Sequence, residues 1–241
     1  MPCCNHLSGK KEDKRVKNKL LSLLFVIFTV LFIISASIAL PIYIRPFYYA
    51  HIEPYNLVER TGRSAEDIRD AYDEVLDYLT LPNKEFGSGV FEYSEEGKSH
   101  FADCKILFTL DTVVLLVSFA AIAILAILAA KGVFKMCRPF GSHILLTCGA
   151  LPFVIFAAIA SVASIDFDTT FIIFHKIFFP GKENWMFNPR TDEIIVALPQ
   201  AFFANCAIFI ASSIIVISLA CVIFGLIEMQ KTKNNEKQRG I

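Results

Sequence analysis

The sequence of 241 residues has no net charge, because 23 Lys and Arg balance 23 Asp and Glu. A nucleic-acid-binding protein normally carries a net basic surface, so this balance argues against that class. Intrinsic disorder is excluded by the hydrophobic content of 55%, because disordered chains are poor in apolar side chains. The apolar excess raises the question of whether these residues are spread along the chain or grouped.

Long segments of the chain contain almost no charged residues, and Asp111 is the only one within them. A helix that crosses a bilayer needs about 20 apolar residues, since it rises about 1.5 Å per residue through about 30 Å of hydrocarbon. The uncharged segments are long enough to do so. We therefore predict four transmembrane spans, at 20–40, 106–130, 143–164 and 202–227.

The remaining charges separate by sign along the chain. The tail 1–19, the loop 131–142 and the tail 228–241 together hold thirteen basic and four acidic residues. The segments 41–105 and 165–201 together hold ten basic and eighteen acidic residues. Short segments rich in Lys and Arg stay in the cytoplasm. Both termini and the loop are expected to be cytoplasmic, and the two acidic segments extracytoplasmic.

The first apolar segment has a second interpretation as a cleaved signal peptide. Small residues around Ser37 and Ala39 resemble a cleavage site. However, the charged tail before this segment is long, and the apolar run fills a whole bilayer. We therefore expect a retained span.

The first acidic segment, 41–105, is long enough to fold as a cap. Residues 42–49 are rich in β-formers and predict a strand. Ser64 and Asp67 have the spacing of a capping box, and the apolar residues that follow recur at helical spacing up to Leu81-Pro82. Ser94 is expected to cap a second helix that continues into the span 106–130. The predicted fold class is a mainly α membrane protein, with four transmembrane helices and a small extracytoplasmic α+β cap.

Two histidines are predicted to lie at the same depth on the outer side. His100 precedes the second span and His175 follows the third. Asp103 shares a helical face with His100 and could orient its ring. A purely interfacial role for each histidine is the simpler alternative. A pair converging among aromatic residues instead suggests a site for acid–base chemistry.

Other catalytic chemistries have weaker support. A zinc site at His100, Asp103 and His175 lacks an H-E-x-x-H motif or a cysteine pair, and no G-x-S-x-G motif indicates a serine hydrolase. Cys104 is the only cysteine expected near the outside, so no extracytoplasmic disulfide within the chain is expected. No cofactor or metal is predicted. A hydrolase on the same face remains a further alternative.

Polar groups inside the spans are few. Asp111 and Asn205 lie there, and an acid at such depth is a candidate functional group. We favour a hydrogen bond from Asp111 to Asn205 or to the backbone, which would fix helix packing. A transporter would need more polar residues or an inverted repeat. A structural or transport function in a four-span protein remains the alternative to an enzyme.

Two segments carry a resemblance to a known family. The first is 94–103, which contains His100 and Asp103 at the entrance of the second span. The second is 171–195, in which aromatic residues surround His175. These segments and the four-span plan resemble the bacterial lipoprotein intramolecular transacylase (Lit) family, which acts at the cell membrane.

The resemblance implies an acyl transfer within one lipoprotein molecule. Its N-terminal cysteine carries a diacylglyceryl thioether, and the sn-2 acyl chain moves to the α-amino group to give a lyso-form lipoprotein. His100 and His175 match the family's two catalytic histidines. Partners would be diacylglyceryl-modified lipoproteins and membrane lipid, with no nucleic acid. Asp103 is expected to orient a histidine, and a protonated imidazole, Asn184 or Trp185 to support the oxyanion. The expected aromatic pocket for the acyl chains consists of Phe171, Phe174, Phe178, Phe179 and Phe187.

Overall fold

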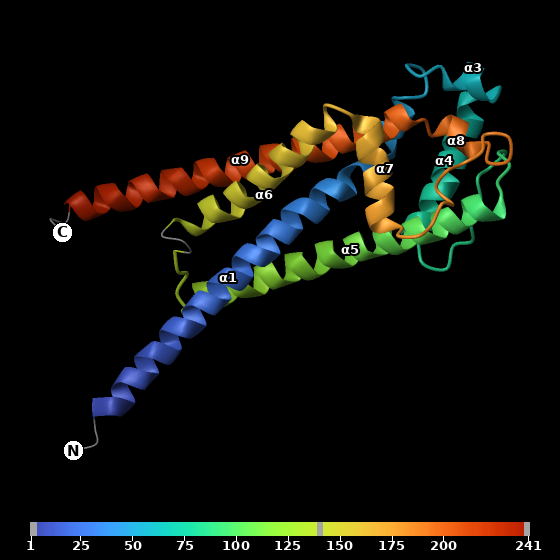
Figure 1. The fold of residues 1–241 in the computed structure, drawn as a ribbon. Coiled ribbons are helices and arrows are strands. Elements are labelled where there is room, and N and C mark those ends of the chain that lie inside the picture. The colour runs from blue at the N-terminus through green and yellow to red at the C-terminus, as the bar shows by residue number, and fades with distance from the viewer. Residues whose placement is uncertain (1–3, 139–141, 239–241) are drawn as a thin grey trace. The chain divides into compact units, whose positions relative to one another are not determined.

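The computed structural model describes residues 4–138 and 142–238, and within them the chain is helical, with no strand. Four helices are long: α1 (Cys4–Tyr43), α5 (Glu95–Ala130), α6 (Ile144–Ala163) and α9 (Gln200–Gln238) (Figure 1). Five are shorter: α2 (Arg45–Tyr49), α3 (Leu57–Thr61), α4 (Ala65–Thr80), α7 (Phe167–Phe178) and α8 (Ile194–Ala197).

The four predicted spans are confirmed as helices. Each long helix contains a stretch that is apolar and long enough to cross a membrane. These stretches lie at Glu12–Tyr43, Glu95–Ala130, Ile144–Ala163 and Gln200–Thr232. Most of their apolar side chains are not buried by the protein, as expected of helices whose outer faces contact lipid rather than water.

The chain forms two compact units, the first made of residues 1–36, 114–158 and 212–241. In this unit α6 and α9 pack backbone to backbone. A Cβ atom placed on Gly149 would lie 2.4 Å from the carbonyl oxygen of Ser218. Such small residues allow membrane helices to approach closely. On α1, the Ser22 hydroxyl accepts a hydrogen bond of 2.8 Å from the backbone N–H of Cys137, which fixes the connection after α5.

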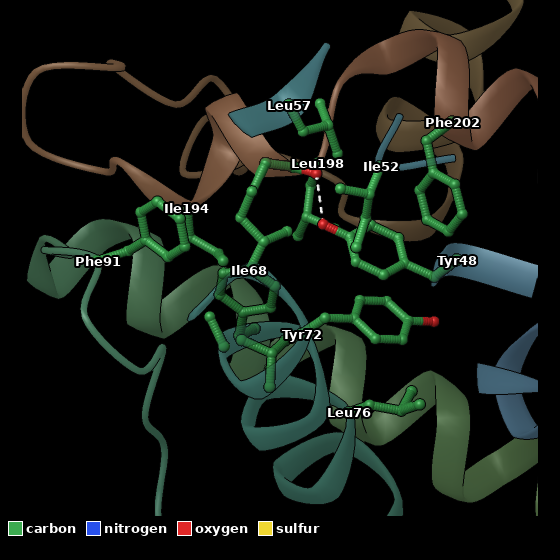
Figure 2. Close-up of a cluster of buried hydrophobic side chains, with 14 of the residues drawn as sticks. Tyr48, Ile52, Leu57, Ile68, Tyr72, Leu76, Phe91, Ile194, Leu198 and Phe202 are labelled. Carbon is green, nitrogen blue, oxygen red and sulfur yellow. Dashed lines mark hydrogen bonds between the residues drawn. The ribbon is translucent and has the colours of Figure 1, made fainter. Parts of the chain in front are cut away.

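The second unit consists of residues 37–113 and 159–211 and contains a buried apolar core (Figure 2). The predicted stripe of α4 faces this core. Tyr48 stacks on Tyr72 with ring centroids 3.8 Å apart, and its hydroxyl donates a hydrogen bond of 2.8 Å to the carbonyl oxygen of Ala197. Figure 2 shows this bond among the core side chains. The stripe residues of α4, all buried, are Ile68, Ala71, Tyr72, Val75, Leu76 and Leu79.

The local signals at helix ends are also confirmed. The Ser64 hydroxyl accepts from the backbone N–H of Asp67 at 3.1 Å, and the Asp67 carboxylate accepts from that of Ser64 at 3.1 Å, completing the capping box. Ser94 accepts from the backbone N–H of Gly97 at 2.9 Å. From there α5 runs without interruption through the second span.

The predicted strand at 42–49 is wrong, and with it the α+β cap. α1 continues to Tyr43, and α2 follows directly with Pro46 near its N-terminus, a position that proline tolerates. β-propensity depends strongly on context. Here the buried position of Tyr48 against α4 decides the conformation. In the described residues of the cap, the regular secondary structure is helical, and turns and loops connect the helices.

Asn205 contacts two side chains of the segment that follows α2. Its Nδ2 atom lies 2.9 Å from Nε2 of His51 and 2.6 Å from the Tyr55 hydroxyl. The other ring nitrogen of His51 donates to the carbonyl oxygen of Phe47 at 2.6 Å. The beginning of α9 is therefore bound to the segment that follows α2.

The Tyr48 hydroxyl gives the first prediction. Tyr48→Phe should lower the free energy of unfolding of the second unit by about 1–3 kcal/mol, because the carbonyl of Ala197 remains buried without its donor. Tyr43→Phe is the matched control. Its hydroxyl, 2.9 Å from Thr112, is in an exposed hydrogen bond, so the same deletion should have little effect. Thermal unfolding in detergent measures both, and equal shifts in Tm would contradict the prediction.

Candidate active site

His100 lies in the second turn of α5 and is almost fully buried, with 6% of its surface exposed. Its Nε2 atom is 3.4 Å from the Cys104 sulfur, one helical turn further on. Its Nδ1 atom is buried and has no hydrogen-bond partner within the described part of the chain. A buried polar atom without a partner is costly, so Nδ1 is available to a bound molecule.

His175 lies on α7 and is 7% exposed. Its Nδ1 atom is 2.7 Å from the carbonyl oxygen of Phe171. Because a carbonyl only accepts, Nδ1 must carry the hydrogen. In the neutral ring the lone pair is then on Nε2, the nitrogen on which the ring can take up a proton.

The two imidazole rings are neighbours, with centroids 5.8 Å apart and planes inclined by 32°. The Phe179 ring contacts both, at 4.9 Å from His100 and 5.8 Å from His175. Phe187 lies 5.4 Å from His100, and Trp185 lies 4.6 Å from His175. The pair predicted from the sequence is thus brought together inside an aromatic cluster.

The other predicted aromatic residues divide into two groups. Phe171 is 4.2 Å from the His175 ring, and Phe174 is 5.4 Å from it. Phe178 contacts Phe174 at 4.6 Å but no histidine, and both are about half exposed. α7 therefore has one face toward the histidines and one exposed apolar face.

The environment of His175 favours its neutral form. Burial lowers the pKa of His175 below its ordinary value of 6.5, and the hydrogen bond to Phe171 opposes this only in part. Desolvation disfavours a charged imidazolium. At neutral pH the ring is therefore a free base with Nε2 unprotonated.

Asp103 binds a different set of residues from the one predicted. Its carboxylate forms an ion pair with Lys182 and accepts a hydrogen bond of 3.0 Å from the Asn184 side-chain amide. The same Nδ2 atom of Asn184 lies 3.4 Å from the Ser99 hydroxyl. The described hydrogen-bond partner of His100 is Cys104, not Asp103.

The loop that carries Asn184, Trp185 and Phe187 is tied to the start of α5 by the buried carboxylate of Asp192. This carboxylate accepts from the Ser94 backbone N–H at 2.8 Å and from the Ser94 hydroxyl at 2.7 Å. A Cβ atom on Gly97 would lie 2.2 Å from the same carboxylate and 3.0 Å from the Phe187 ring. Only glycine lets the loop come this close to α5.

Lys182 and the Cys104 thiol are the site groups that sequence reasoning missed. Cys104 follows His100 by four residues, so helical spacing could have indicated the contact. Lys182 belongs to an irregular loop, where no periodicity reports which residues meet. Among the described residues, no group of three or more His, Cys, Asp or Glu could hold a metal ion.

These features define what the site can do. Two adjacent imidazoles can move a proton between groups of a bound molecule. The aromatic side chains around them exclude water and suit an apolar ligand. Asp103, Lys182 and Asn184 provide a polar area beside them.

Solved structures with the same fold come from Bacillus cereus. The chain is similar to the membrane-integral lipoprotein intramolecular transacylase Lit of that organism, with a TM-score of 0.80 and 23% identity over 90% of this chain and 98% of that one. Structures of two variants of that protein, a histidine-to-arginine and a histidine-to-alanine exchange, give TM-scores of 0.77 and 0.76 at 21% and 22% identity. They cover 95% and 93% of this chain and 99% of theirs.

The sequence itself matches a family model. No curated protein sequence matches the chain significantly. The model described as lipoprotein intramolecular transacylase Lit matches residues 23–203, a range that contains His100, His175, the whole second and third spans and most of the first. The chain therefore belongs to the Lit family of membrane-integral lipoprotein transacylases, whose substrates are lipoproteins.

Proposed function

We propose that this enzyme moves the sn-2 acyl chain of a diacylglyceryl-modified lipoprotein to the α-amino group of the same N-terminal cysteine, with His100 and His175 as its two catalytic residues. The observation that carries the proposal is the pair of buried imidazoles, 5.8 Å apart, within an aromatic cluster. The reaction needs one base and one proton donor and no further reactant.

His175 is the base in this proposal. The α-ammonium group must lose a proton before its nitrogen attacks the ester. The Nε2 lone pair of His175 accepts that proton, since its Nδ1 hydrogen is held by Phe171. The new N–C bond then forms as the C–O bond to the glyceryl sn-2 oxygen breaks. The ammonium loses two protons in all, because the amide nitrogen keeps one hydrogen. One proton leaves to solvent, and the imidazolium of His175 delivers the other to the released oxygen, which becomes a hydroxyl.

His100 is the electrostatic partner in this proposal. If the Cys104 thiol donates to Nε2, the neutral ring of His100 carries its hydrogen on Nδ1. This buried N–H, which has no partner among the described residues, can donate to the developing oxyanion. A donor fixed in a dry site is worth more than one in water.

The amide of Asn184 is a poor candidate for the same task, because its N–H groups face Asp103 and Ser99. The indole N–H of Trp185 donates to the carbonyl oxygen of Lys182 at 3.1 Å. Trp185 instead contributes its ring, which packs on His175. Both observations favour His100 as the oxyanion donor.

The aromatic side chains serve the acyl chains and keep water out. Phe171, Phe179 and Phe187 contact the histidines, so a thioether-linked diacylglycerol would meet carbon rather than water around its ester. Exclusion of water favours attack by the amine over hydrolysis. Because both reacting groups belong to one molecule, holding it in a folded conformer provides much of the acceleration.

The proposed orientation follows from the charges. The basic tails 1–19 and 228–241 and the loop 131–142 lie in the cytoplasm, and the histidines act on the outer side, where lipoproteins are displayed. Acyl chains enter from the outer leaflet. The hydrolase alternative would use the same histidines but would need water at the ester.

Removal of either histidine tests the proposal. His100→Ala and His175→Ala should each reduce formation of N-acyl lyso-lipoprotein by about 10²–10⁴-fold, the usual contribution of a positioned acid or base. The measurement is mass spectrometry of lipoproteins from a host that lacks other N-acylating enzymes. His143→Ala, which changes a histidine of the other unit, is the control and should stay active. Normal product from either variant would remove that histidine from the mechanism.

The pH dependence tests the role of His175. Its depressed pKa means that the neutral form of His175 predominates at pH 6.5 and that the midpoint of its protonation lies at lower pH. The acid limb of kcat/KM should therefore have its midpoint below pH 6.5, with a slope of one. Initial rates with a synthetic diacyl lipopeptide in detergent give this profile. An acid limb centred at about 8, the pKa of a free α-amino group, would mean that the amine is deprotonated before it binds.

A further inference from the structure

The side-chain amide of Asn184 has a fixed orientation that leaves its oxygen without a donor. A carboxylate only accepts hydrogen bonds, so the NH₂ group of Asn184 must face Asp103, at 3.0 Å. The second N–H of this group is directed to the Ser99 hydroxyl at 3.4 Å. The Oδ1 atom is then buried and unbonded within the described part of the chain. A buried acceptor of this kind is expected to accept a hydrogen bond from a ligand.

The Asp103 carboxylate beside it is mostly buried, with 15% of its side chain exposed, and is paired with a lysine whose side chain is 48% exposed. About half of the Lys182 side chain is therefore in contact with solvent. Pairs that involve an exposed lysine contribute little stability, so a competing cation can displace this one without large cost.

A lysine ammonium and an α-ammonium are the same chemical group. Each carries one positive charge and three N–H donors. The place that Lys182 occupies on Asp103 is thus suited to any primary ammonium with access to it. The two acceptors, Asp103 and Asn184 Oδ1, would satisfy two of its three donors.

The polar group lies close to His100 and beside the tryptophan that contacts His175. Asp103 is three residues after His100 and lies on the same side of α5, and its charge and that of Lys182 act on the His100 ring. Asn184 directly precedes Trp185, whose ring lies 4.6 Å from His175. An ammonium held here has its third N–H free for an imidazole.

We propose that Asp103 and Asn184 form a subsite for the α-ammonium group of the substrate, and that Lys182 occupies the Asp103 part of this subsite as an internal substitute when no substrate is bound. The inference rests on the proposed function, which supplies the ammonium. Transfer of the acyl group turns the ammonium into an uncharged amide. The amide loses its attraction to Asp103, Lys182 returns, and the product is released.

Binding of a non-reactive lipopeptide tests the subsite. The probe is a synthetic cysteine lipopeptide whose two acyl esters are replaced by ethers, so no acyl chain can move. One form has a free α-amine and the other is N-acetylated. The protein has a single tryptophan, Trp185, so its fluorescence reports binding at this position in the full chain in detergent.

Lys182→Met should bind the free-amine probe roughly two- to fivefold more tightly than the wild type, because a weak ion pair no longer competes. Asp103→Asn and Asn184→Leu should bind it about tenfold or more weakly, since each removes an acceptor for a charged donor. All three should bind the N-acetylated probe as the wild type does. Lys176→Met, which removes an exposed lysine of α7, is the control for charge and should change neither affinity.

The gain in affinity of Lys182→Met is decisive, because damage to the fold would not produce it. Unchanged or weaker binding of the free amine by this variant overturns the subsite, as does an equal gain for both probes. The two proposals fail separately. If the ester substrate is not converted but the binding pattern holds, the transacylation mechanism is wrong and the ammonium subsite stands. If conversion occurs without the binding pattern, the reverse is true.

Discussion

The buried carboxylate of Asp192 and its two hydrogen bonds to Ser94 determine where the candidate site can form. They fix the start of α5, which carries His100, against the loop that carries Asn184, Trp185 and Phe187. The Ser94 hydroxyl donates to Asp192 while it accepts from the Gly97 backbone, so one side chain serves both the helix cap and the loop. Without these two hydrogen bonds, the aromatic side chains of the loop would have no fixed position over the imidazoles.

The two histidines are equally buried but differ in what holds them. His175 is anchored by a backbone carbonyl, which fixes its tautomer regardless of side-chain changes elsewhere. His100 is held by a thiol, a weak and adaptable partner. This asymmetry supports different tasks for the two rings, one as the proton acceptor and the other as the hydrogen-bond donor.

Much of the fold could be predicted because its signals are local. The spans depend on composition, the capping box on a spacing of three residues, and the α4 stripe on helical periodicity. The strand predicted at 42–49 was wrong because the conformation of this segment depends on long-range contacts. Its aromatic and β-branched residues have strand propensity, but Tyr48 packs on Tyr72 and binds Ala197, contacts that propensity does not report. Asn205 likewise bonds His51 and Tyr55 across about 150 positions of sequence.

The candidate site likewise contains some residues that the sequence could predict and others that it could not. Topology predicted that His100 and His175 share one face, and the family resemblance marked them as the residues of interest. The partners of Asp103 could not be predicted, because Lys182 and Asn184 lie in a loop with no repeat or pattern. Loop geometry depends on long-range contacts, such as the hydrogen bonds between Asp192 and Ser94. The spacing of residues along the sequence does not predict such contacts.

The difference between the two faces of α7 has a consequence for purification of the protein. Its inner face holds His175, while Ile172, Ile173, Phe174, Ile177 and Phe178 on the outside are 41–66% exposed. Within the described chain these apolar side chains are left uncovered, so the surrounding medium contacts this face of α7. The choice of detergent or lipid for purification therefore affects the environment of the helix that carries His175, as well as the solubility of the protein.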